Sequence, residues 1–247
     1  KNVELSDVPK QQQSTQPTKL ETPALRGDFV DLPQRRLYEK TLRKFSYSID
    51  AEGKHYAPYY NKEGKIVAQK IRTPDKNFYV TGDLTKAGLF GQQLWSPGDR
   101  LVITEGEIDC LSYAQVTGLT WQVVSVPNGA SGALKTIRKQ IQWIEQFKEV
   151  VFLFDQDEPG IKAARECAAI LKPGIAKIAK LPLKDSNEMI VAGRDGELKS
   201  AIYSAQPYRP EGIVAGEDIV LADVLKGVPK GLDIPYLELN AAIRGYE

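Results

Sequence analysis

Two runs of apolar residues that each end in carboxylates constrain the fold of this chain more than any other feature. Residues 101–104 (LVIT) are followed at once by Glu105, and residues 150–154 (VVFLF) by Asp155 and then Asp157. Short, nearly continuous apolar runs are typical of parallel strands that are buried on both faces. Open α/β sheets bind ligands beyond the carboxyl ends of their strands, so these acids lie where a binding site is expected.

From residue 97 onward, predicted strands alternate with predicted helices. The strands are expected at 101–104, 123–126, 150–154 and 175–181, and the helices at 108–116, 133–147, 159–171 and, beyond the loop 184–188, up to about 205. About four strands joined by helical crossovers predict an α/β fold, a parallel sheet with helices on both faces. Pro159 in the first turn of a helix and Pro173-Gly174 after its end agree with these bounds.

The segments on either side of this unit (97–208) differ from it in character. Residues 1–33 are polar, with a Gln/Ser/Thr/Pro stretch, and predict a linker or extended arm. Residues 34–96 predict a small α+β subdomain, with a basic amphipathic helix over 34–45 and β-like runs at 56–60 and 66–71 around a turn. Residues 209–247 predict a linker with a short helix over 217–226. Because the chain contains no GxxxxGK[ST] phosphate loop, no helicase activity is expected from it alone.

Composition argues against a zinc module, a disulfide framework and a membrane-spanning segment. The charges of the 33 basic and 32 acidic residues nearly cancel, so DNA or nucleotides would have to bind at a local cluster of positive charge. Cys110, Cys167 and the single histidine, His55, cannot build a zinc module or a disulfide framework, and His55 is expected to be an ordinary surface residue. No apolar run approaches the roughly 18 residues that span a bilayer, and no signal-peptide pattern is present, so we expect a soluble, intracellular protein.

The acids suggest a chemistry, and each also has a simpler structural interpretation. Hard oxygen ligands without soft donors beside them suit Mg²⁺ or Mn²⁺, and therefore phosphate chemistry. Asp155 and Asp157 are spaced to reach one ion, but Asp157 equally suits a helix cap before Glu158-Pro159. Asp185 also fits a capping box, and Asp109 fits the first turn of a helix, where the dipole favours an acid.

Three cations form a second candidate group. Lys70, Arg72 and Lys76 fall on a predicted strand and loop, where they suit a triphosphate or the backbone of a template. A solvated strand face would have the same pattern.

Five short motifs, in this order, give the chain a family resemblance. They are KNF at 76–78, AGLFG at 87–91, TEGEID at 104–109, FDQDEPG at 154–160 and KDSNE at 184–188. A strand ending in Glu-Gly, then a helix, then a strand ending in Asp-x-Asp resembles the Toprim fold of primases, topoisomerases and some nucleases. Together the motifs resemble the primase domain of the bifunctional primase-helicases of T-odd phages and the related Twinkle, from about residue 33 to 210.

The resemblance implies a DNA primase, a nucleotidyltransferase that synthesises short RNA primers on single-stranded DNA from ribonucleoside triphosphates, using Mg²⁺ or Mn²⁺. It also implies a zinc-binding template-recognition module and a helicase domain in the full-length protein. The expected location is the host cytoplasm for a phage protein, and otherwise an organelle or the cytoplasm.

The same resemblance assigns roles to individual residues. Asp155 and Asp157 become catalytic metal ligands, and Glu105 becomes the leading catalytic residue, as a general base or in a metal-linked role. Asp109 and Asp185 match family positions near the metal. The residues expected to bind nucleotide or DNA are Lys70, Arg72 and Lys76.

Two alternatives from other functional classes stay open. A Toprim nuclease would use the same acids to hydrolyse phosphodiesters, but the subdomain before the Toprim unit resembles that of primases. A non-catalytic DNA-binding or assembly module, as in animal Twinkle with its eroded acids, is opposed by the intact Glu105, Asp155 and Asp157.

Overall fold

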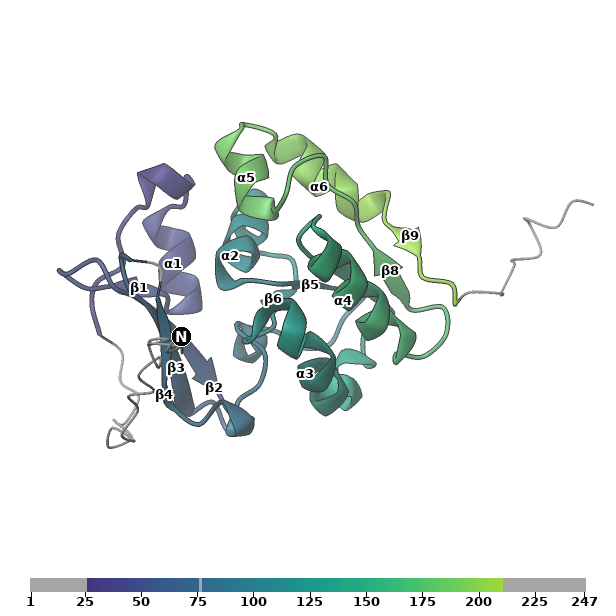
Figure 1. Ribbon diagram of the computed structural model, residues 1–247, viewed down its shortest axis with the longest axis horizontal. Helices are drawn as coiled ribbons and strands as arrows, with labels where there is room; N and C mark the ends of the chain where they lie inside the picture. Colours follow the sequence, from purple (N-terminus) through teal and green to yellow (C-terminus); the bar gives the residue numbers. More distant parts are fainter. Residues whose placement is uncertain (1–25, 76, 211–247) are drawn as a thin grey trace, which may run out of the picture. The chain divides into compact units, whose positions relative to one another are not determined.

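The computed structural model describes residues 26–75 and 77–210, which form two β-sheets flanked by helices (Figure 1). Lys76, most of the expected arm at 1–33 and the helix expected at 217–226 lie outside the described residues. None of the helices within the described ranges is both long enough and apolar enough to cross a membrane.

The smaller sheet is antiparallel, and its strands follow one another in chain order. They are β1 (Ser48–Ile49), β2 (His55–Tyr60), β3 (Ile66–Arg72) and β4 (Phe78–Gly82). The sequence predicted β2 and β3 closely, but it left 78–82 without a strand. Phe78, Tyr79 and Val80 of β4 are all exposed, so the alternation that marks a half-buried strand is missing there.

The helix predicted over 34–45 was wrong in its first half. Residues Pro33–Arg35 form a 3-10 turn, Arg36 has left-handed backbone angles (φ 49°), and the α-helix, α1, spans Glu39–Phe45. Leu37 is fully buried, and its backbone forms a two-way bridge with Leu32. Leu37 therefore contributes to the apolar pattern because it enters the core from an extended segment, not because it is helical.

The larger sheet has the strand order β6-β5-β7-β8-β9. Four of its strands are parallel, namely β5 (Arg100–Thr104), β6 (Val123–Ser125), β7 (Glu149–Leu153) and β8 (Ala176–Ile178). This arrangement confirms the expected parallel α/β sheet. The structure adds β9 (Gln206–Pro207), a two-residue antiparallel strand at the edge beside β8.

Helices cover both faces of the larger sheet, each over its own hydrophobic core (Figure 1). On one face lie α2 (Glu107–Val116), α5 (Ser186–Val191) and α6 (Asp195–Tyr203), and on the other α3 (Gly129–Ile144) and α4 (Glu158–Ala169). Alternate strand residues point to opposite faces, so Val102 and Val151 join the first core while Ile103 and Phe152 join the second. Residues of α1 and the smaller sheet belong to the first core, which holds that sheet against α2.

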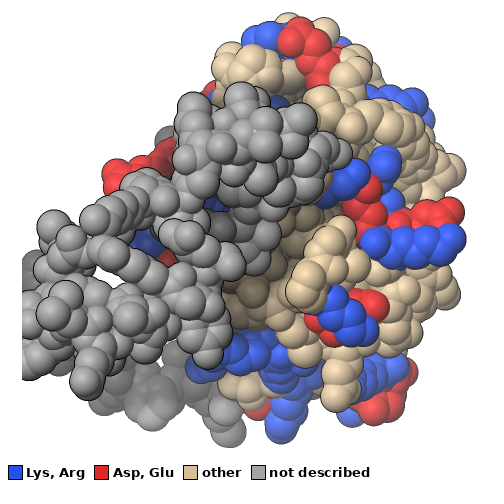
Figure 2. Space-filling view, turned by 90° about the vertical axis from the view of Figure 1, so that its right-hand side faces the viewer, with Lys and Arg blue, Asp and Glu red and all other residues tan. Residues whose placement is uncertain are grey.

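Charges of both signs are mixed on the described part of the face that Figure 2 shows. Seen from the right-hand side of Figure 1, Lys and Arg side chains lie beside Asp and Glu side chains over the described part of that face (Figure 2). Ion pairs such as Arg194–Glu197 (2.6 Å) and Lys162–Glu166 (3.9 Å) link neighbours along α6 and α4. The surface in this view agrees with the near-zero net charge, so a polyanion would have to be held at a local site.

Candidate active site

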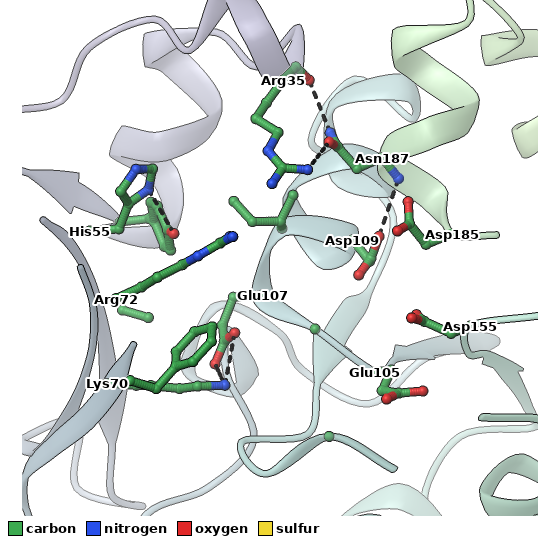
Figure 3. Close-up of a pocket in the computed structure, with 16 residues that line it drawn as sticks. Arg35, His55, Lys70, Arg72, Glu105, Glu107, Asp109, Asp155, Asp185 and Asn187 are labelled. Carbon is green, nitrogen blue, oxygen red and sulfur yellow. Dashed lines mark hydrogen bonds and ion pairs between the residues drawn. The ribbon is translucent and has the colours of Figure 1, made fainter. Parts of the chain in front are cut away.

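A cavity of about 270 Å³ lies between one face of the smaller sheet and the carboxyl ends of β5 and β7 (Figure 3). Its two sides differ in charge. The acidic side chains that line it are Glu105, Glu107, Asp109, Asp155 and Asp185, and the basic ones are Arg35, His55, Lys70 and Arg72. The cavity therefore brings acids from the loops and helices at the carboxyl end of the larger sheet opposite basic residues that come mainly from the smaller sheet. Glu107 is the exception, because it pairs with Lys70.

Glu105 follows β5 and lies at the start of α3. Its Oε1 accepts a hydrogen bond from the backbone N–H of Ala130 (3.0 Å), in the first turn of that helix. Its Oε2 is buried and has no hydrogen-bond partner within the described part of the chain. One carboxylate oxygen is thus held by the fold, whereas the other is withdrawn from water without a partner, which is costly for a charged group.

The environment of the site raises the pKa of Asp155 and of Asp109. Burial, followed by the charges of Glu105 and Asp185, raises the pKa of Asp155 to about 6. Burial, followed by the charges of Asp185 and Asp155, raises the pKa of Asp109 well above its usual value. In both cases burial disfavours the charged form of the carboxyl most strongly, and repulsion by neighbouring carboxylates adds to it.

Two of the predicted acids also act as helix caps. Asp157 accepts a hydrogen bond from Gly160 N (3.0 Å) at the start of α4, and Asp185 accepts one from Glu188 N (2.7 Å) at the start of α5. The Asp157 side chain is 45% exposed and does not line the cavity, whereas Asp185 does. Lys184 lies near both acids of the β7 loop, 3.7 Å from Asp155 and 3.6 Å from Asp157.

Two of the three predicted cations lie at the cavity. Lys70 and Arg72 line the cavity, while Lys76 is not among the described residues. Lys70 forms an ion pair with the buried Glu107 (3.0 Å) and donates to the carbonyl of Pro127 (3.0 Å). Glu107 also accepts a hydrogen bond from the hydroxyl of Tyr59, so the partner that holds the Lys70 ammonium group is itself held in place.

His55 is not the ordinary surface residue that the sequence suggested. It lines the cavity, its Nδ1 is 3.0 Å from the hydroxyl of Tyr47, and burial, followed by the charges of Arg72 and Arg35, lowers its pKa. The expectation was wrong because a lone histidine in sequence gives no sign of the sheet face that it shares with Arg72.

Arg35 and Asn187 are two further cavity residues that the sequence did not single out. Arg35 Nη1 donates to Asn187 Oδ1 (3.0 Å), and Asn187 Nδ2 donates to the carbonyl of Arg35 (3.0 Å) and to Ser112 Oγ (3.0 Å). The backbone N–H of Asn187 donates to Asp109 (3.2 Å). Asn187 lies within the KDSNE motif, which was the one available signal.

The acidic side of the cavity fits a divalent cation by its chemistry. All its donors are carboxylate oxygens, and one of them is buried without a partner among the described residues. Burial, and then repulsion by neighbouring carboxylates, raises the pKa of Asp155. A bound Mg²⁺ or Mn²⁺ would offset each of these costs. In the described part of the chain, no three His, Cys, Asp or Glu side chains are already arranged as a metal-binding group.

Comparisons with known families agree with the two-sheet architecture. Residues 102–190 match the model described as Toprim-like. Residues 27–82 match the model described as the N-terminal a+b fold of the bacteriophage T7 DNA helicase/primase.

Known relatives point the same way. The chain is 37% identical over 192 residues to the DNA helicase/primase of Enterobacteria phage T3, an alignment that covers 76% of this chain and 34% of that protein. It is 28% identical over 180 residues to the chloroplastic/mitochondrial Twinkle homolog protein of Arabidopsis thaliana, covering 64% and 25%. The chain thus spans about a third of the first relative and a quarter of the second.

Solved structures support the same grouping. The primase fragment of the bacteriophage T7 primase-helicase superposes with a TM-score of 0.71 at 34% identity, covering 78% of this chain and 83% of the fragment. The DnaG catalytic core superposes with a TM-score of 0.53 at 15% identity, covering 72% of each chain, which shows a shared fold.

Proposed function

Because this chain belongs to the T7-type family of phage primase-helicases, within their primase domain, we propose that it synthesises short RNA primers on single-stranded DNA from ribonucleoside triphosphates. The observation that carries the proposal is the cavity itself. It places metal-suited carboxylates at the ends of β5 and β7 directly opposite Lys70 and Arg72 (Figure 3). Such a cavity suits a substrate that is both polyanionic and reactive at phosphorus.

The reaction joins two nucleotides by in-line attack. The 3′-oxygen of one nucleotide forms a bond to the α-phosphorus of the next, the bond to pyrophosphate breaks, and the 3′-hydroxyl gives up its proton. A divalent ion, when bound, would lower the pKa of that hydroxyl and neutralise charge on the phosphates. In this proposal Glu105, Asp109, Asp155 and Asp185 would hold the ion, and Asp157 would contribute a further carboxylate from the start of α4.

The protein's own groups supply the remaining functions. Lys70 and Arg72 bind phosphate oxygens, and the ion pair of Lys70 with Glu107 keeps its ammonium group in place. Lys76 is proposed to act with them, as the family resemblance implies. Glu105 has an oxygen without a partner among the described residues, so it is the carboxylate placed to take the hydroxyl proton or to contact the ion.

The proposal extends to the rest of the protein. We assign residues 34–96 and 97–208 to two subdomains of one primase unit, with linkers at 1–33 and 209–247. In the full-length protein a zinc-binding template reader and a helicase domain would accompany this unit. The protein would act in the host cytoplasm if it is encoded by a phage, and in an organelle or the cytoplasm otherwise.

The test is a synthesis assay. The chain is incubated with single-stranded DNA, labelled ATP and CTP, and Mg²⁺ or Mn²⁺, and its products are resolved by length. The proposal expects short RNA from the wild-type chain and none from Asp155→Ala with Asp157→Ala. Asp99→Ala is the matched control, because Asp99 is an exposed acid paired with Lys148 outside the cavity and its loss should leave synthesis unchanged.

Other outcomes would point to the rival functions. Metal-dependent cleavage of the DNA without RNA products would support a nuclease. Binding of DNA with no chemistry, in the presence of an added template-recognition module, would support an assembly module. Synthesis that survives loss of both acids would refute the site.

A further inference from the structure

One face of the smaller sheet continues beyond the cations to an exposed aromatic side chain. Strand pairing aligns His55, Arg72 and Phe78 in one row across β2, β3 and β4, and Ala57, Lys70 and Val80 in the next. Residues paired across neighbouring strands point to the same face of a sheet. Phe78 and the two cations therefore share the face that lines the cavity.

Phe78 is a large apolar side chain that stays exposed at the edge of the smaller sheet. Its side chain belongs to β4, the edge strand, and 56% of its surface is accessible, yet it also lines the cavity. The Lys70 ammonium lies 5.2 Å from the ring centre and the Arg72 guanidinium 5.5 Å from it. The two cations therefore hold the ring beside the site, while more than half of its surface stays open.

We propose that Phe78 is a stacking platform for a nucleobase whose attached phosphates lie against Lys70 and Arg72. This proposal rests on the proposed function, and it adds a base-binding subsite to a cavity otherwise described by phosphate and metal chemistry. A flat aromatic ring beside cations is complementary to a nucleotide, since every base has a π-face and every phosphate a negative charge. Stacking tolerates any base, so the platform would hold nucleotides without selecting a sequence.

The neighbouring residue provides a matched control. Tyr79 follows Phe78 in β4 and is 44% exposed, but it pairs with Ile71, on the opposite face of the sheet. A substitution there removes a similar amount of exposed aromatic surface from the same strand. The two side chains point to different faces of the sheet. That of Phe78 lies on the face that lines the cavity, and that of Tyr79 lies on the other.

The first experiment measures binding of a fluorescein-labelled single-stranded DNA 8-mer and of an abasic oligomer of equal length, by anisotropy, without NTPs and at one fixed salt concentration. If the platform holds a base of the template, Phe78→Ala will weaken binding of the base-bearing oligomer by about 5- to 150-fold, the range expected for loss of one aromatic–base stack. Binding of the abasic oligomer should change less than twofold. Phe78→Trp should retain tight binding, and Tyr79→Ala should leave both affinities unchanged.

A second experiment identifies the source of the base. ATP and inorganic tripolyphosphate are each titrated as competitors against a fluorescent nucleotide analogue. If the platform holds the incoming nucleotide, Phe78→Ala will remove the advantage of ATP over tripolyphosphate, whereas a platform for the template will show its effect with the oligomer alone. The proposal is overturned if the wild-type chain prefers neither base-bearing ligand, or if Phe78→Ala weakens base-bearing and base-free ligands equally.

Neither experiment depends on turnover. A chain that binds bases through Phe78 but makes no RNA would retain the platform and lose the primase proposal. If the wild-type chain makes RNA and Phe78→Ala binds bases as well as the wild type does, the primase proposal is retained and the platform is refuted. Circular dichroism of each variant verifies folding, which loss of a half-exposed side chain at a sheet edge should leave intact.

Discussion

Replacing Asp155 with asparagine should stabilise the folded protein at neutral pH and abolish primer synthesis. Burial, together with the charges of Glu105 and Asp185, raises the pKa of the Asp155 carboxyl from 3.8 to about 6. Its ionised form is therefore less favourable in the folded protein than in the unfolded chain. An asparagine side chain has almost the same shape without the charge, so the substitution would remove that repulsion from the folded protein.

The magnitude follows from the shift in pKa. About 2 pKa units at 1.36 kcal/mol each give an upper value of about 3 kcal/mol. That shift already includes the opposing attraction of Lys184, 3.7 Å away. The side chain is 19% exposed, so solvent screening brings the gain below this upper value. We therefore expect a net gain of about 1–2 kcal/mol in the free energy of unfolding at pH 7.5.

The sign of the pH dependence is fixed by the direction of the shift. Because the folded pKa is raised, the stability associated with protonated Asp155 is fully present below 3.8 and is lost as the pH rises through about 6. The advantage of Asp155→Asn should be largest above pH 6 and fall to roughly a third of that value at pH 4.5.

Urea denaturation in EDTA at pH 7.5, 6 and 4.5 measures this difference. Asp99→Asn is the control, because a hydrogen bond from Lys148 and its positive charge lower the pKa of Asp99, and the control should not gain stability at pH 7.5. Adding Mg²⁺ should then stabilise the wild-type protein more than Asp155→Asn. The reasoning is refuted if Asp155→Asn is no more stable than the wild type at pH 7.5, or if its gain is the same at pH 4.5.

Two other substitutions, one of them with a matched control, test how the fold supports the site. Gly160→Ala would place a Cβ 2.4 Å from the carbonyl oxygen of Asp155, so we expect a loss of about 1–3 kcal/mol in urea unfolding and a loss of metal-dependent synthesis. Gly196→Ala, which meets open space in α6, should instead gain up to about 1 kcal/mol, and equal effects at the two glycines would contradict the packing argument. Asn187→Ala removes the side-chain bonds to Arg35 and should lower stability by about 2 kcal/mol in thermal unfolding; an unchanged melting temperature would show that this network is not structural.

Much of the larger sheet could be predicted because its strands carry a strong local signal. Residues 101–104 and 150–154 are nearly continuous apolar runs, and β5 and β7 occupy nearly those bounds. The smaller sheet was harder. The exposed residues of β4 show no alternation of apolar and polar side chains. Leu37 fits the spacing of a helix in the sequence, but it belongs to an extended segment that pairs with Leu32.

Some residues of the candidate site could likewise be predicted from the sequence, and others could not. Glu105 and Asp155 could be proposed because strand ends of a parallel sheet converge, and the cavity does include both. His55 and Phe78 reach the cavity through the packing of the smaller sheet, and Arg35 reaches it through the contact of its 3-10 turn with Asn187 of α5. A single sequence carries no pattern for such tertiary contacts.

Primer synthesis by Glu105→Gln tests the central claim most directly. Glutamine can keep the hydrogen bond from Ala130 through its carbonyl oxygen, but it removes the charge and the proton-accepting oxygen that has no partner among the described residues. With saturating Mg²⁺ and a single-stranded template, the account predicts that the yield of short RNA falls about 100-fold or more while the variant stays folded. A variant that is folded and makes RNA at the wild-type rate would contradict the assignment of this cavity as the active site.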